Sequence, residues 1–185
     1  MARIKDEDYA YATARIRARE MKFMNRNKMD RLLDASDSSD AIKLLQESGY
    51  SSDHTDNSSE AADRIEMLLS AELKRAYDFL FDILPDPRAL ELFLRRYDYL
   101  NAKLILKAES LGIDASGSLC GLGTLKPEKL LKYIADRKFD ELPETFGKAI
   151  TESLAAFSKT SDPQVIDFIL DKVSYTNMLE DARDT

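Results

Sequence analysis

Apolar residues recur along most of this chain at the three- and four-residue spacing of amphipathic helices. The clearest examples are two long segments, residues 61–84 and 87–111, which Pro85-Asp86-Pro87 separates. Both prolines resist the continuation of a helix that starts before them, so we expect one helix to end and another to begin here. Two long helices joined by so short a turn are predicted to pack as an antiparallel hairpin.

Shorter helices are predicted on both sides of this hairpin. Helix-start and helix-end residues mark several of them: Asp37 and Thr124 as N-caps, Gly49 as a C-terminal stop, and Asp162 as the N-cap of the last helix. Asn57 and Glu60 have the spacing of a capping box before the first long helix. We expect these shorter helices over residues 8–26, 29–34, 40–47, 144–157 and from 163 onward, and one more after Thr124, with Pro127 in its first turn.

The pattern predicts an all-α fold, because no long stretch alternates apolar and polar residues as a half-buried strand does. Residues 1–185 are expected to form a single helical domain, a bundle built on the long central hairpin.

The first predicted helix has two contrasting faces. Its apolar face is expected to hold Tyr9, Ala10, Ile16, Met21, Phe23 and Met24. Opposite them, four cations follow helical spacing and form a basic stripe, namely Arg15, Arg19, Lys22 and Arg26. Two interpretations stay open: an ordinary solvated face, or a surface that meets an acidic partner.

The second long segment is apolar nearly all round, which is typical of a helix at the centre of its domain. Its apolar positions include Phe93, Leu100 and Leu106. Asn101 lies on the apolar stripe, with Asp98 and Lys103 beside it. A buried amide requires hydrogen-bond partners, so we expect Asn101 to fix the crossing of two helices; a ligand or partner contact is the alternative.

Charge and composition narrow the function classes. The net charge is −7, which argues against broad nucleic-acid binding because phosphates demand clustered cations. The single cysteine, Cys120, cannot form an internal disulfide, and a reducing, cytoplasmic setting is expected. The polar first residues do not resemble a signal peptide, and no apolar run approaches the roughly 20 residues that span a bilayer. Any membrane association is therefore expected to come through a partner.

Candidate chemistry is sparse. Residues 112–123 are rich in glycine. They do not match a phosphate-binding loop, because the required lysine is missing, and they do not match a dinucleotide-binding fingerprint. We therefore expect this segment to be a flexible connector. His54 lies among acidic residues without metal-ligand spacing. Cys120 is expected to be an inert thiol, because the chain has one histidine and that residue is distant in sequence.

We therefore expect no catalytic, cofactor-binding or metal-binding residues, and no enzyme activity from this chain by itself. No nucleophile elbow is present, and no pair of carboxylates stands on an apolar background where a shifted pKa would be expected. A small helical hydrolase that uses Cys120 or His54 is the least favoured alternative.

Three stretches, taken in order, resemble one family, the C subunits of V-type and archaeal-type ATPases (ATP synthases), whose eukaryotic counterparts are the d subunits. They are Tyr9-Ala10-Tyr11-Ala12-Thr13-Ala14-Arg15-Ile16-Arg17, Tyr97-Asp98-Tyr99-Leu100-Asn101-Ala102-Lys103, and Asp162-Pro163 through Tyr175. Lys28-Met29-Asp30-Arg31-Leu32-Leu33, Asp40-Ala41-Ile42-Lys43-Leu44-Leu45 and Leu142-Pro143 are similar to the elements between them. The resemblance covers nearly the whole chain.

The resemblance implies a mechanical role. Such proteins are built from three similar helical repeats arranged as a funnel, and they have no catalytic residues of their own. They couple the rotor shaft, which the D and F subunits form, to the membrane rotor ring (the c/K ring) in ATP-linked proton or sodium transport. The implied location is cytoplasmic and peripheral to the membrane, and no cofactor is implied.

Members of the family continue for about as long again, so we expect this chain to be an amino-terminal half. Residues 162–185 would lead into a second repeat that is not present, and apolar surface meant for the other half would be exposed. A free-standing helical adaptor, which binds a protein through the basic stripe, is the alternative function. Neither the coupled ion nor the direction of ATP chemistry follows from these residues.

Overall fold

The computed structural model describes residues 5–50 and 60–184, and within these ranges it contains helices and no β-strand. The all-α prediction is therefore confirmed. The chain divides into two compact units, Met1–Pro87 and Arg88–Thr185, which are described separately below. The two long helices fall in different units, so their packing as a hairpin stays a prediction, as does the single domain.

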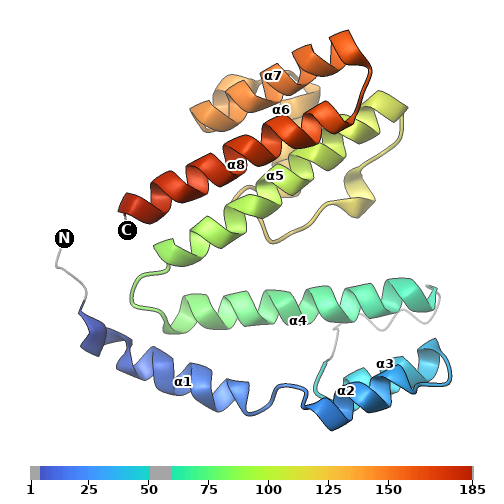
Figure 1. The fold of residues 1–185 in the computed structure, drawn as a ribbon, viewed down its shortest axis with the longest axis vertical. Helices are drawn as coiled ribbons and strands as arrows, with labels where there is room; N and C mark the ends of the chain where they lie inside the picture. Colours follow the sequence, from blue (N-terminus) through green and yellow to red (C-terminus); the bar gives the residue numbers. More distant parts are fainter. Residues whose placement is uncertain (1–4, 51–59, 185) are drawn as a thin grey trace. The chain divides into compact units, whose positions relative to one another are not determined.

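In the described part of the first unit, residues 5–50 and 60–87, there are four α-helices (Figure 1). A 3₁₀ turn, Asp6–Tyr9, leads into α1; the helices are α1 (Ala10–Glu20), α2 (Arg26–Leu33), α3 (Ser38–Glu47) and α4 (Ala61–Ile83). Asp37 caps α3 as predicted, since its side chain accepts a hydrogen bond from the backbone N–H of Asp40. Gly49 follows α3 with φ +95°, a conformation that favours glycine and ends the helix.

The predicted helix over residues 8–26 is wrong at its C-terminal end. α1 stops at Glu20, and Asn25 then caps α2 by accepting a hydrogen bond from the N–H of Lys28 at 3.0 Å. Met21 and Phe23 therefore do not share an apolar face with Ile16, and their side chains are exposed. The buried residue of α1 is Ala12 instead.

The basic stripe is also corrected, because its four members do not lie on one helix. Lys22 follows the end of α1, and Arg26 is the first residue of α2. The guanidinium groups of Arg15 and Arg19 lie over the ring of Phe79 in α4, at 5.6 and 4.7 Å from its centroid. Arg19 also forms an ion pair with Glu72 at 3.3 Å. These two arginines hold α1 against α4.

The second unit is built on two long helices, α5 (Arg88–Leu111) and α8 (Gln164–Asp184), which lie side by side (Figure 1). Between them along the chain come the 3₁₀ turn Ser116–Ser118, α6 (Pro127–Ala135), the 3₁₀ turn Phe139–Glu141 and α7 (Glu144–Thr160). Pro127 opens α6 and Asp162 accepts a hydrogen bond from the N–H of Gln164 at 2.9 Å, both as predicted. The proposed Asn57 capping box and His54 lie outside the described residues.

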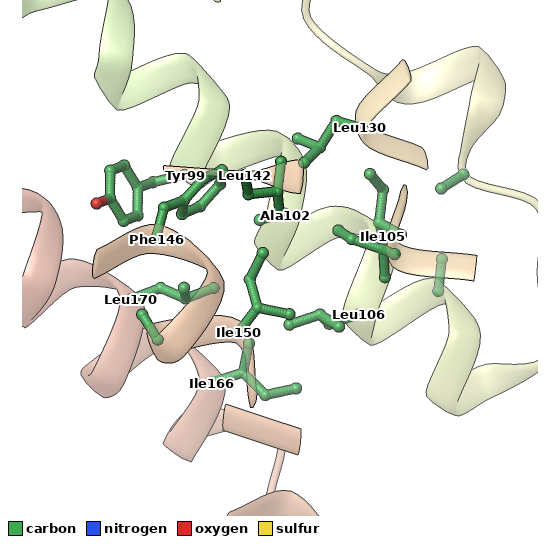
Figure 2. Close-up of a cluster of buried hydrophobic side chains, with 14 residues drawn as sticks. Tyr99, Ala102, Ile105, Leu106, Leu130, Leu142, Phe146, Ile150, Ile166 and Leu170 are labelled. Atoms are coloured by element: carbon green, nitrogen blue, oxygen red, sulfur yellow. The ribbon is translucent and has the colours of Figure 1, made fainter. Parts of the chain in front are cut away.

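Apolar side chains from α5, α6, α7 and α8 meet in one core (Figure 2). Leu130, Ile134, Ile150, Ile166 and Leu170 are fully buried there. The rings of Tyr99 and Phe146 pack against each other with centroids 4.5 Å apart. Burying one such aliphatic or aromatic side chain contributes about 1.5–3 kcal/mol, so this core is the main stabilising element of the second unit.

The prediction that the second long segment is buried nearly all round is corrected. α5 buries Leu94, Tyr99 and Leu106 as its sequence predicts, but Phe93 and Leu100 are exposed. In α8, the apolar side chain of Leu179 is exposed as well.

Candidate functional site

Two polar residues of α5, Asp98 and Asn101, are buried and bind the backbone of the connector that follows the helix. Asn101 donates from Nδ2 to the carbonyl oxygen of Cys120 and accepts at Oδ1 from its N–H, both at 2.8 Å. The side-chain amide of Asn101 thus provides hydrogen-bond partners for both the N–H and the carbonyl oxygen of Cys120. The prediction that Asn101 fixes a helix crossing is wrong, because its partner is the connector.

Asp98 holds the next part of the same connector. One carboxylate oxygen accepts from the N–H and the hydroxyl of Thr124, at 3.1 and 2.6 Å, and the other accepts from the N–H of Leu125 at 3.0 Å. Thr124 therefore does not cap α6 as predicted; Lys126 occupies the N-cap position. Burial raises the pKa of Asp98 from its ordinary value of 3.8, and these hydrogen bonds oppose that rise.

Gly123 makes the approach of Asp98 to the connector possible. A Cβ atom at this position would lie 2.1 Å from Oδ1 of Asp98. By contrast, a Cβ at Gly121 would meet no atom within 4 Å. The connector was predicted to be flexible, but residues 120–125 form five hydrogen bonds with Asp98 and Asn101, which donate one and accept four.

A polar ladder runs between α5 and α8. It consists of Lys107 with Asp167 at 2.6 Å, Lys103 with Asp171, Tyr99 with Asn177 at 2.8 Å, and Arg95 with Asp181. Its α5 members are four residues apart and share one face, so successive turns of antiparallel helices are joined. Asn177 also donates to Thr145 in α7 at 2.9 Å, which ties a third helix to the ladder.

The polar atoms of both clusters bind the connector backbone or join helices. The thiol of Cys120 is half-buried, and it is the backbone of this residue that Asn101 binds. Within residues 5–50 and 60–184, no three His, Cys, Asp or Glu side chains are grouped to hold a metal ion. A hollow of about 130 Å³ beside Lys28 and Arg31 is smaller than the roughly 300–1,000 Å³ of small-molecule sites. In the same described part, no helix is long and apolar enough to cross a bilayer.

Sequence patterns contained part of this geometry. The two lysines of the ladder stand four residues apart, as do two of its aspartates, and this spacing places side chains on one face of a helix. The hydrogen bonds between Asp98 or Asn101 and residues 120–125 could not be predicted from periodicity. The path of a connector relative to a helix has no regular repeat in the sequence.

Comparison with known proteins points to one family. The family model described as ATP synthase (C/AC39) subunit matches residues 12–185. The C subunit of the A-type ATP synthase of Methanocaldococcus jannaschii is 26% identical over 176 residues, which are 89% of this chain and 44% of that protein. The corresponding C subunit of a Desulfurococcus species is 30% identical over 132 residues, 70% of this chain and 36% of that protein. That of Thermococcus kodakarensis is 27% identical over 132 residues, with the same coverage.

The chain thus spans less than half the length of these curated relatives. No solved structure gives a significant match. The match to the family model includes all the helices from α2 to α8 and most of α1. The chain therefore belongs to the ATP synthase (C/AC39) subunit family, as its three ordered motifs indicated.

Proposed function

We propose that this chain is a non-catalytic central-stalk subunit of a rotary V/A-type ATPase, which couples the D–F rotor shaft to the membrane rotor ring. The observation that carries the proposal is the family match over residues 12–185, together with relatives that are named as the C subunits of A-type ATP synthases. The machine that it serves would move protons or sodium ions in exchange for ATP hydrolysis or synthesis.

The geometry of the second unit supports a mechanical role. A subunit that transmits torque requires helices that do not slide past one another. The polar ladder joins α5 to α8 over four successive turns of α5, and Asp98 and Asn101 fix the connector to the same helix. Interactions of this kind favour one register between helices over neighbouring registers, and so they resist shear.

The proposed partners are the D and F subunits of the rotor shaft and the membrane rotor ring (the c/K ring). The proposed location is cytoplasmic and peripheral to the membrane, reached through the complex rather than by insertion. No cofactor or nucleic acid is part of this proposal. The chain spans less than half the length of its relatives. The contacts with the shaft and the ring are therefore proposed for the whole gene product as it occurs in its cell.

The alternative, a helical adaptor that binds a protein through the basic stripe, has less structural support. Two of the four stripe residues, Arg15 and Arg19, are engaged with Phe79 and Glu72 of their own unit. Charge reversal at Lys22 and Arg26, the other two stripe residues, which are exposed, separates the two functions without disturbing those contacts. An adaptor would lose its main partner, whereas a rotor socket with a broad contact surface would lose little.

The test is affinity purification of the tagged gene product from its own cells. We expect the D and F subunits and the ring to co-purify, and the purified chain to hydrolyse no nucleotide. Recovery of some other partner with none of these proteins would reject the proposal.

A further inference from the structure

We draw no further inference here: the strongest candidate, the exposed apolar patch of Phe168, Tyr175 and Leu179 on the outer side of α8, carries none because nothing in the structure shows what covers it.

Discussion

Asn101 forms two hydrogen bonds of 2.8 Å with the backbone of Cys120, one to its carbonyl oxygen and one from its N–H. Asn101→Ala leaves both backbone groups without this partner in a buried place. An unsatisfied buried polar group costs about 1–3 kcal/mol, so we expect the free energy of unfolding to fall by about 2–4 kcal/mol. Urea denaturation measures the loss. Ser110→Ala, which removes an exposed side-chain bond to the carbonyl oxygen of Lys107, should cost much less.

Gly123→Ala tests the close approach of Asp98 to the connector. Because the added methyl group would lie 2.1 Å from Oδ1 of Asp98, the connector or the carboxylate must shift. Overpacking of this kind costs about 1–3 kcal/mol. The paired control is Gly121→Ala, where the methyl group meets nothing within 4 Å, and thermal denaturation should show little change. An equal loss of thermal stability in both variants would mean that Asp98 does not closely approach the backbone at Gly123.

The pKa of Asp98 gives a pH dependence with a defined sign. Its folded-state pKa is raised from 3.8 by burial, so the folded protein holds the proton at pH values where the unfolded chain has released it. The contribution of this group to stability is therefore fully present below about pH 4 and is lost as the pH rises through the folded-state value. Asp98→Asn cannot titrate, although it disturbs the hydrogen bonds to Thr124 and Leu125.

The difference in unfolding free energy between the natural chain and Asp98→Asn should accordingly shrink as the pH rises from about 4 toward neutrality. Urea denaturation at a series of pH values measures it. A difference that grows with pH would show that the three hydrogen bonds outweigh burial and hold the pKa of this carboxyl below its ordinary value.

The Lys103–Asp171 pair should contribute more to stability than an ordinary surface ion pair. The side chain of Lys103 is only 17% exposed, whereas Lys148 and Glu144, an ion pair within α7, are 74% and 80% exposed. A double-mutant cycle with Lys103→Met and Asp171→Asn should give a coupling of about 1 kcal/mol, and the cycle for Glu144 and Lys148 about 0.3–0.5 kcal/mol. Equal coupling energies in the two cycles would mean that the Lys103–Asp171 pair contributes no more than an ordinary surface ion pair.

Much of the fold was predictable because helix signals are local. The prolines between the long helices, the cap at Asp37 and the glycine after α3 all act on their own neighbours, and each prediction was confirmed. The end of α1 was missed because two local signals competed there. Helical spacing continued through Arg26, but the cap at Asn25 starts a new helix, and an N-cap residue has extended backbone.

The polar contacts of α5 were predictable only in part. A buried amide in the sequence of a helix shows that partners exist but does not identify them. Asn101 finds its partner nineteen residues ahead, in a connector whose path depends on the packing of α6. The buried side of α8 could not be predicted for a related reason: the helix has two apolar sides, and periodicity alone does not say which of them is covered.

Coupling of the rotor shaft to the membrane ring, the function proposed for this chain, requires contact with both. Cross-linking mass spectrometry of membranes from its own cells tests this most directly, because it captures contacts within the assembled complex. We predict cross-links from the lysines of this chain to the D and F subunits of the shaft and to the cytoplasmic side of the rotor ring. Cross-links confined to other proteins, with the ATPase present in the same membranes, would contradict the claim.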